Sequence, residues 1–221
     1  MNRIRIKMIK YLLAILLLSD ISTNAQPVNQ HVVLVEYAFS QFLPGNIKMK
    51  SGETYDRILN YNIVTNEMIF ENNGKYLAIA NPEKVDTVTI NQRKFIFLNN
   101  KFYEILFNSK MPLMLEYTAT IQEPGTSTGY GTTSNTASAS TFKSLISQGG
   151  SYTLQLPEGY TVIPRYEYWI LKNGQLERAG NERGLIKIFP KKKDAIKELV
   201  QKNQTNFSKT EDLIMLVKSL E

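Results

Sequence analysis

The sequence predicts a mainly β, α+β protein, in which an antiparallel β-meander closes into a sandwich or small barrel and a C-terminal α-helical hairpin follows. Three observations lead to this fold class. Residues 31–122 consist of short runs of alternating apolar and polar residues, separated by turns rich in Asn and Gly. The same alternation returns in residues 151–172. Residues 191–220 then change to a helical period.

The turn Asn73-Gly74 is the strongest hairpin signal in the chain. A type I′ turn needs positive φ at both central residues, and Asn and Gly adopt this conformation most readily. A two-residue loop here places Phe70 opposite Leu77 and Met68 opposite Ile79. These four side chains share one face, so the register predicts a core-facing ladder.

Similar turns join other expected strands. The turns, with the pairs that they place opposite each other, are Asn91-Gln92, Asn99-Asn100 (Phe97 with Phe102) and Asn173-Gly174 (Leu171 with Leu176, Trp169 with Arg178). The expected strands are residues 31–37, 46–50, 53–62, 67–72, 75–80, 86–90, 93–98, 102–107, 111–122, 151–156 and 160–172. Short strands joined in this way are typical of antiparallel all-β architectures.

Two amphipathic helices are expected after the strands. Residues 191–203 and 208–220 each place their aliphatic side chains on one helical face. Ser208 and Glu211 fit a capping box, S-x-x-E, which sets the start of the second helix. The connection is short, so we expect an antiparallel helical hairpin packed on the sheet. Residues 184–189 fit either a strand or a short helix.

Residues 124–141 interrupt the strand pattern with Gly, Ser and Thr, and Tyr130 is the one aromatic residue in residues 124–140. Ordering such a segment costs backbone entropy that it cannot recover by apolar burial. We expect a loop, which is either a plain connector or a segment that orders against a partner through Tyr130. It separates a β-rich domain, residues 26–123, from residues 142–221, which carry a β-hairpin and the helical hairpin. The latter form a second domain or belong to the first.

The first 25 residues have the pattern of a secretory signal peptide. Basic residues precede the apolar run Tyr11–Leu18, and Thr23 and Ala25 are the small residues before the expected cleavage site. The apolar run is too short for a membrane core, which needs about 20 residues. Cleavage after Ala25 predicts an exported protein, periplasmic or extracellular and associated with the outer surface, without a transmembrane segment. Because the chain has no cysteine, it is not a lipoprotein.

The composition restricts the chemistry further. The lack of cysteine excludes disulfide bonds, a thiolate nucleophile and a Cys-ligated metal. His31 is the only histidine and stands near the expected mature N-terminus, so we expect no His-based catalysis, no metal site and no cofactor. The net charge of +6 falls to +3 without the signal peptide, and we therefore expect no nucleic-acid partner.

Two features of the sequence suggest catalysis, an S-x-x-K motif and a set of carboxylates on the expected strands. Ser140 and Lys143 match the S-x-x-K pattern of serine β-lactamases, but the companion motifs are missing, so no catalytic residue is assigned. A glycosidase, in contrast, needs only two suitably spaced carboxylates. The candidates on or beside strands are Glu104, Glu116, Glu158, Glu167 and Glu177, and no spacing singles out a pair.

Residues 164–172 have the composition of a binding surface. Alternation puts Arg165, Glu167 and Trp169 on one face and Tyr166, Tyr168 and Ile170 on the other. Aromatic and charged groups together suit sugar stacking or a protein interface. The alternative is an ordinary half-buried sheet in which Trp169 stacks on Arg178. The candidate binding residues are Tyr130, Arg165, Tyr166, Tyr168, Trp169 and Arg178.

A basic patch precedes the first expected helix and consists of Lys187, Lys191, Lys192 and Lys193. It either contacts an acidic surface such as anionic lipid headgroups or is a solvated helix start. Positive charge is unfavourable at a helix N-terminus, so the second interpretation leaves the cluster unexplained.

These observations predict a non-catalytic binding or accessory protein of a bacterial-type cell envelope, which interacts with another envelope protein or a glycan. The alternative is a carboxylate-dependent hydrolase acting on glycan or peptide, and a β-barrel carrier of a small ligand is a third possibility. Two carboxylates about 5–9 Å apart in a cleft would favour the hydrolase. A wide internal cavity would favour the carrier, and an aromatic sheet face would favour the binding protein.

Overall fold

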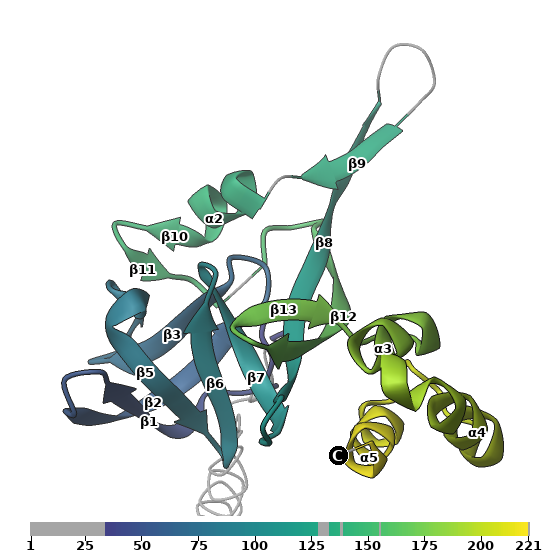
Figure 1. Cartoon of the computed structure of the whole chain (residues 1–221). Helices are drawn as coiled ribbons and strands as arrows, with labels where there is room; N and C mark the ends of the chain where they lie inside the picture. The colour runs from purple at the N-terminus through teal and green to yellow at the C-terminus, as the bar shows by residue number, and fades with distance from the viewer. Residues whose placement is uncertain (1–33, 128–132, 138, 155, 221) are drawn as a thin grey trace, which may run out of the picture. The chain divides into compact units, whose positions relative to one another are not determined.

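An antiparallel sheet dominates the computed structural model of the chain, and helices follow it in sequence (Figure 1). The structure describes residues 34–127, 133–137, 139–154 and 156–220. These residues all belong to one compact unit, Val32–Glu221. The expected signal peptide, His31 and Tyr130 lie outside the described residues.

Thirteen strands form the sheet in the described part of the chain. Their bounds are β1 (Leu43–Met49), β2 (Thr54–Asn62), β3 (Glu67–Asn72), β4 (Lys75–Ala78), β5 (Val85–Ile90), β6 (Arg93–Leu98), β7 (Lys101–Phe107), β8 (Leu113–Ser127), β9 (Thr133–Ala137), β10 (Ser147–Gln148), β11 (Ser151–Tyr152), β12 (Thr161–Lys172) and β13 (Gln175–Arg178). Across the sheet their order is β10-β11-β4-β3-β2-β1-β5-β6-β7-β8-β12-β13, and β9 pairs with β8.

The sheet is curled but open. Strands β10 and β13 stand at its two ends, and no pairing between described residues joins them. The curl brings β3 close to β7, although four strands separate them in the sheet order. The prediction of a mainly antiparallel β protein with C-terminal helices is confirmed, whereas the predicted closure into a sandwich or barrel is not.

The helical elements are η1 (Pro82–Lys84), α2 (Ala139–Ile146), α3 (Glu182–Ile188), η2 (Pro190–Lys192), α4 (Lys193–Asn203) and α5 (Thr210–Ser219). Helices α4 and α5 are the two that the sequence predicts. Residues 184–189, which fitted either a strand or a helix, belong mostly to α3, and the side chain of Asn181 caps its start by accepting the Gly184 N–H. None of the helices in the described ranges is long and apolar enough to span a bilayer.

The tight turns are confirmed. Asn73 and Gly74 have φ angles of 51° and 75°, Phe70 lies opposite Leu77, and the Ile79 N–H donates to the Met68 carbonyl at 3.0 Å. The turns at Asn91-Gln92, Asn99-Asn100 and Asn173-Gly174 have positive φ at both residues as well. Their predicted pairs also form, namely Phe97 with Phe102, Trp169 with Arg178 and Leu171 with Leu176.

The predicted first strand is wrong over its described residues. Residues 34–41 make one isolated bridge, Tyr37 with Asn62, instead of a ladder. Two backbone bonds hold the segment, from the Ala38 N–H to the Tyr61 carbonyl and from the Ile63 N–H to the Glu36 carbonyl. The buried side chain of Asn60 adds to them: its Oδ1 accepts the Phe39 N–H at 3.2 Å, and its Nδ2 donates to the Phe39 carbonyl at 2.8 Å. A side-chain amide offers both a donor and an acceptor, so it can hold a neighbouring segment without regular strand pairing.

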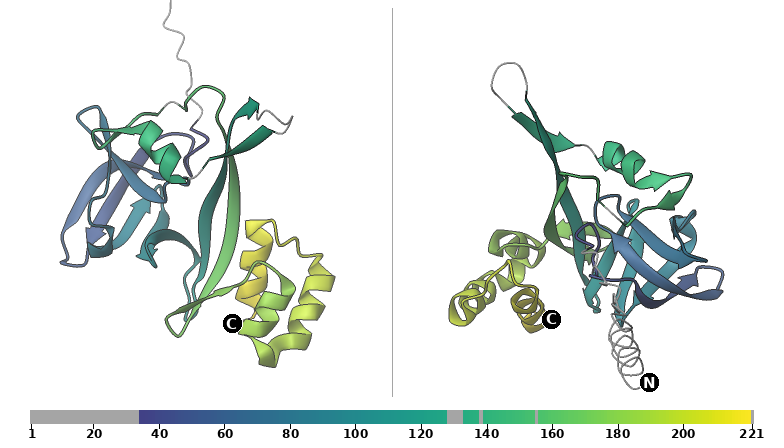
Figure 2. Two further views of the ribbon diagram at one scale, coloured as in Figure 1. Left: turned by 90° about the horizontal axis from the view of Figure 1, so that it is seen from above. Right: turned by 180° about the vertical axis from the view of Figure 1, so that it is seen from behind.

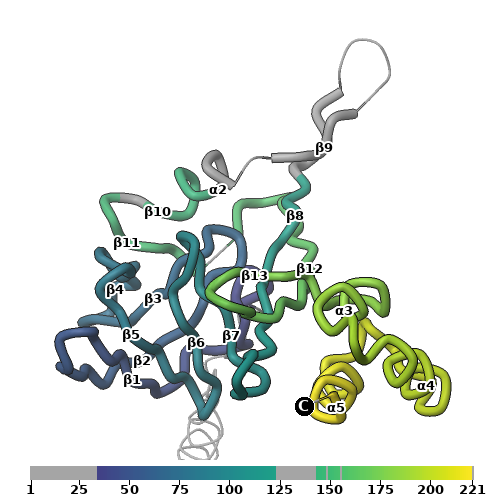
Figure 3. The backbone as a smooth tube through the Cα atoms, viewed as in Figure 1, coloured from purple at the N-terminus to yellow at the C-terminus, as the bar shows by residue number. Residues whose placement is uncertain are grey.

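The segment 124–141 differs from the expected loop. Strand β8 continues to Ser127 and pairs with β9, with Gln122 opposite Thr136 and Thr126 opposite Ser134. Residues 139–146 form α2 (Figure 1), and the coloured end of α2 leads towards β10 and β11 in Figure 3. Backbone pairing needs no aliphatic side chain, and Thr favours extended structure, so low apolar content did not exclude a hairpin. In residues 151–156 the expected strand is confined to β11.

One apolar core joins the sheet to the C-terminal helices. The cluster contains the buried residues Tyr168 and Ile170 of β12 and Leu113 and Leu115 of β8. It also contains the apolar faces of the helices, represented by Leu185, Ile196, Leu213, Leu216, Val217 and Leu220. Helices α3 and α5 contact the end of the sheet that carries β12, through β13 and β7, and α4 packs on α3 and α5; Figure 2 shows the helical group from two sides.

The predicted capping box at Ser208 is wrong. Helix α5 begins after Lys209, and no side chain caps that residue. Instead, Asp212 in the first turn accepts the backbone N–H of Asn206 at 2.9 Å, and the Asn206 side chain accepts the Ser208 N–H at 2.9 Å. The start of α5 is thus held by an acidic side chain reaching back to the preceding loop.

Candidate binding groove beside strand β12

Strand β12 orients its side chains as the alternation predicts. Tyr168 and Ile170 point into the core and are buried, whereas Tyr166, on the same face, is 56% exposed. Arg165 is exposed, and Trp169 lies on the opposite face from Tyr168. Strand β8 on one side, with Tyr168 opposite Leu115, fixes this arrangement along the whole strand.

Two neighbouring hollows share Tyr166, Tyr168 and Ser208, and together we call them the Tyr166 groove. The edge hollow, of about 400 Å³, lies where β13 leaves β12. The interior hollow, of about 380 Å³, lies between β8, β12 and the start of α5. The edge hollow is also lined by Glu167, Arg178, Gly180, Asn181 and Phe207, and the interior hollow by Ala38, Arg93, Leu115, Tyr117, Lys209, Thr210 and Glu211.

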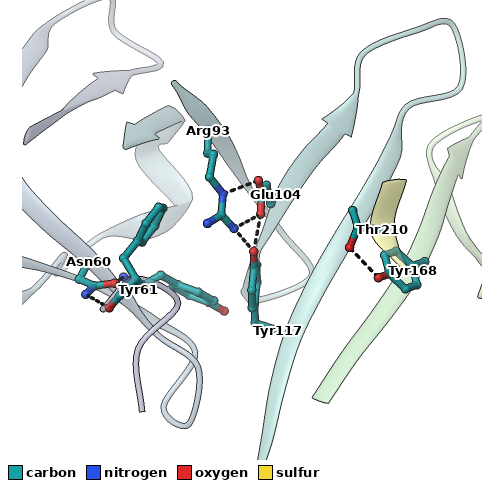
Figure 4. Close-up of polar contacts among 8 residues, drawn as sticks. Asn60, Tyr61, Arg93, Glu104, Tyr117, Tyr168 and Thr210 are labelled. Carbon is teal, nitrogen blue, oxygen red and sulfur yellow. Dashed lines mark hydrogen bonds and ion pairs between the residues drawn. The ribbon is translucent and has the colours of Figure 1, made fainter. Parts of the chain in front are cut away.

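Tyr166 stands between the two hollows and is held by other aromatic groups. Its ring meets the Tyr117 ring edge-to-face, with ring centroids 5.6 Å apart. The Tyr168 hydroxyl and the Thr210 hydroxyl are 2.8 Å apart and form a hydrogen bond between β12 and α5 (Figure 4). The groove therefore combines an exposed ring, fixed hydroxyl groups and flanking charges.

A charged cluster lines the interior hollow. Arg93 on β6 donates from Nε to Glu104 of β7 at 2.6 Å and from Nη2 to the second Glu104 oxygen and to the Tyr117 hydroxyl. The Tyr117 hydroxyl donates to Glu104 in turn (Figure 4). The guanidinium also lies over the Phe39 ring, 4.4 Å from its centroid. Three strands and the segment before β1 thus meet at Arg93.

The electrostatics of this cluster are set mainly by burial. The Glu104 side chain is 7% exposed and the Arg93 side chain is 34% exposed. Burial raises the pKa of Glu104 above its ordinary value, and the Arg93 guanidinium opposes part of that rise. The two charges largely neutralise each other. The cluster is therefore a hydrogen-bonded polar lining of the interior hollow, and Arg93 is not a free cation.

Sequence reasoning missed Arg93 and Tyr117. Arg93 lies on the same side of β6 as Phe95, which is fully buried in the core. A charged residue on the core-facing side of a strand is rarely buried without a partner, so this position could have indicated a paired group. Its partners Glu104 and Tyr117 lie 11 and 24 residues away in sequence. No local pattern links them, because their meeting depends on the order of the strands.

The opposite face of β12 carries the predicted stack. The Arg178 guanidinium lies 5.2 Å from the Trp169 ring centroid, and it pairs with Glu167 at 2.8 Å. The Trp169 indole N–H donates to Glu116 at 2.8 Å, and Lys101 pairs with Glu116 at 2.5 Å. This is the alternative that the sequence offered for Trp169, and the indole N–H and guanidinium are already occupied within the sheet.

The candidate carboxylates are mostly bound to cations. Glu104 is bound to Arg93, Glu116 to Lys101 and Glu167 to Arg178. Glu158 is exposed and Glu177 is half-buried. Glu116 and Glu167 lie opposite each other in the strand register. Their cationic partners reduce the repulsion and suit a structural role.

The basic patch has one assigned contact. Lys187, Lys191, Lys192 and Lys193 are all exposed at α3, η2 and the start of α4. Lys192 donates from Nζ to the carbonyl of Leu220, the residue that ends α5. A cation at a helix C-terminus is favourable, which explains why this lysine stands at the start of α4.

The S-x-x-K lysine is bound elsewhere. Lys143 on α2 pairs with Glu67 of β3 at 2.5 Å, and Glu67 also accepts the Tyr152 hydroxyl. Among the residues that the structure describes, no three His, Asp or Glu side chains form a group that could hold a metal ion. Comparisons with protein families, with curated proteins and with solved structures give no match for this chain.

Proposed function

We propose that the protein is an exported, non-catalytic binding protein of the cell envelope, which recognises another envelope component through the Tyr166 groove. The observation that carries the proposal is the exposure of Tyr166. Its neighbours on the same face, Tyr168 and Ile170, are buried, yet Tyr166 is 56% exposed and flanked by two hollows. Rigid, partly exposed aromatic rings are enriched at binding surfaces.

The surrounding groups support binding without chemistry. Glu104 and Glu167, beside the groove, are each bound to an arginine, and Glu211, which lines the interior hollow, is exposed in the first turn of α5. A glycosidase needs an acid and a second carboxylate that face the substrate at about 5–9 Å from each other. The hydrolase therefore stays the weaker proposal, and it would require Glu104 to leave Arg93.

Export rests on the sequence of residues 1–25. The basic start, the short apolar run and the small residues before Gln26 support cleavage after Ala25 and a periplasmic or outer-surface location. N-terminal sequencing of the protein from its native host should begin at Gln26. An intact N-terminus on protein recovered from the cytoplasm would contradict export.

Retention of envelope components on the immobilised protein tests the groove. The wild-type protein, residues 26–221, and the control variant Tyr55→Ala should retain equal amounts of the same component. Tyr55 serves as the control because it is a comparably exposed tyrosine on β2, away from the groove. Tyr166→Ala should lower the retained amount about tenfold, the effect of one lost aromatic contact of about 1.4 kcal/mol. Purified sacculi and solubilised envelope proteins, assayed separately, distinguish a glycan from a protein partner.

Two results would contradict the proposal. Equal retention by wild type and Tyr166→Ala would remove the groove from the interaction. Turnover of a glycan or peptide substrate by the wild type, abolished in Glu104→Gln, would replace the binding protein with a hydrolase.

A further inference from the structure

The backbone hydrogen bonds of β12 show which residues face each side of the strand. The Leu171 N–H donates to the Pro112 carbonyl, on the β8 side. The Ala179 N–H donates to the Tyr168 carbonyl, on the β13 side. In an antiparallel sheet the N–H and C=O of one residue point the same way and alternate along the strand. Odd-numbered residues of β12 therefore bond to β8, and even-numbered residues point to the other edge.

That other edge is only partly paired. Strand β13 pairs with β12 from Trp169 to Lys172 and then leaves it, while β8 continues along β12 to Thr161. The backbone groups of Val162, Pro164 and Tyr166 therefore point to an edge on which no described strand lies. The edge hollow lies at Tyr166, Glu167 and Tyr168, where β13 departs, and adjoins the Tyr166 end of this free edge.

Pro164 occupies the middle of this free edge. Proline has no N–H, and natural sheets place it on edge strands, where it limits uncontrolled pairing. Tyr166, which is 56% exposed, offers one donor and one acceptor, and the exposed Pro164 offers an acceptor, whereas Val162 is buried at 6% exposure. An added strand can thus bond at Tyr166 and Pro164, in a register that the missing donor restricts.

The side chains beside the edge indicate the occupant. On the core side, Tyr166, Tyr168 and Phe207 line the hollow and suit apolar side chains. On the opposite side, Arg165 is exposed and has no ion-pair partner among the described residues, whereas Arg178 is already paired with Glu167 and stacked on Trp169. A second copy of this chain fits poorly, because a two-fold axis at Pro164 would place the two Arg165 side chains diagonally across the new strand pair, and an axis at Arg165 would place them directly opposite each other.

We propose that the free edge of β12 at Pro164 and Tyr166 docks an extended polypeptide segment that adds to the sheet as a further strand and alternates apolar with acidic residues. Adding a strand to an exposed sheet edge is a general mode of peptide recognition, in which main-chain bonds give affinity and alternate side chains give specificity. The inference rests on the proposed binding function and specifies the partner as a protein segment instead of a glycan.

Hydrogen exchange of the free protein tests the edge itself. The Tyr166 N–H should exchange at least tenfold faster than the N–H groups of Arg165 and Glu167, which bond to β8. Slow exchange at Tyr166 in the isolated protein would mean that the edge is already covered, and would overturn the proposal.

A synthetic probe tests the occupant. The probe is a nine-residue acetylated and amidated peptide in which glutamate alternates with valine, and the control carries lysine in place of glutamate. Added to residues 26–221, the glutamate peptide should slow exchange at Tyr166, and the lysine peptide should bind at least tenfold more weakly. Equal binding of both peptides, or binding of neither, would overturn the proposed occupant.

Backbone-modified probes separate strand addition from side-chain contact alone. Two versions of the glutamate peptide carry N-methyl groups on alternate residues, in opposite phase. Only one phase faces β12, so one version should bind like the parent and the other should lose binding. Equal binding of both versions would show that no strand is added.

Variants of the protein complete the test. Arg165→Glu should weaken the glutamate peptide about tenfold, since an attraction becomes a repulsion. Pro164→Val restores an edge donor and should tighten binding several-fold. Failure of all peptides while Tyr166→Ala still lowers retention of an envelope glycan would overturn this inference and leave the proposed binding function standing.

Discussion

At the scale of single residues, the buried polar groups are the most informative. Asn60, Glu104 and Glu116 are buried and bonded. Glu36 is also buried, at 1% exposure, but its Oε2 has no hydrogen-bond partner among the described residues. Burial raises the pKa of Glu36 from 4.5 to about 7. This carboxyl group is therefore neutral in the folded protein at acidic pH.

The raised pKa predicts the pH dependence of stability. Between pH 4.5 and about 7 the folded protein holds a proton on Glu36 that the unfolded chain releases. The stabilisation is thus complete below pH 4.5 and is lost as the pH rises to about 7. In the wild type, the free energy of unfolding should fall by an amount on the order of 2–3 kcal/mol across this pH range. The Glu36→Gln variant should not show this fall. Denaturant titrations at several pH values measure it.

The matched control for Glu36 is Glu83→Gln, because Glu83 is exposed in η1. This variant should keep the pH dependence of the wild type. A Glu36→Gln protein with the same pH profile as the wild type would show that Glu36 does not titrate differently in the two states.

Gly45 in β1 is a second residue with a sharp prediction. A Cβ at this position would lie 2.8 Å from Leu59 Cδ1 and still closer to the Thr89 carbonyl oxygen. Neither the backbone of β5 nor the fully buried Leu59 can move easily, so Gly45→Ala should cost about 1–3 kcal/mol. Gly180→Ala, whose Cβ would meet only Tyr168 at 3.9 Å, should change stability by less than about 0.5 kcal/mol. Equal thermal stability of both variants would contradict the close approach.

At the scale of elements, the ends of α5 depend on residues outside a simple pattern. Asp212 holds the loop before the helix, and Lys192 bonds to the carbonyl of Leu220 at its end. Opposite charges at the two ends agree with the helix dipole. Asp212, and not Ser208, therefore makes the hydrogen bond that stabilises the start of α5.

The contributions of Asp212 and Ser208 to the stability of α5 can be compared by mutation. Asp212→Ala should lower the free energy of unfolding by about 1 kcal/mol, since it removes a charged hydrogen bond at the positive end of α5. Ser208→Ala should change it by less than about 0.5 kcal/mol, because the side chain makes no capping bond. Chemical denaturation of both variants decides, and a larger loss for Ser208→Ala would restore the capping box.

At the scale of the whole molecule, the sheet and the C-terminal helices share one core. Tyr168 and Ile170 of β12 and Leu213 and Leu216 of α5 belong to the same buried cluster. Helices α3 and α5 bury apolar side chains against this end of the sheet, and α4 buries its own against α3 and α5. We therefore expect the helices and the sheet to unfold together.

Trp169, the one tryptophan, makes this expectation testable. Its fluorescence reports on β12, and far-ultraviolet circular dichroism reports largely on the helices. The two denaturation curves of residues 26–221 should coincide within error, as in a two-state transition. A loss of helix signal at a lower denaturant concentration than the fluorescence change would show that α3, α4 and α5 form a separate unit.

The sequence by itself determined the local features of this protein. The turns at Asn73-Gly74 and Asn173-Gly174, the pairs beside them, the alternation along β12 and the positions of α4 and α5 could all be predicted. Their physical basis is local, because turn residues restrict φ and side chains alternate with a period that the backbone fixes. Tyr166 was likewise found as a candidate from alternation and composition alone.

The tertiary structure alone decided which segments meet. The sheet places β1 beside β5, β4 beside β11 and β8 beside β12, although none of these pairs is joined by a tight turn. That order brings Arg93 to Tyr117, forms the two hollows beside Tyr166 and leaves one edge of β12 free. Long-range neighbours are selected by the burial of apolar surface over the whole chain, a sum that no short stretch of sequence contains.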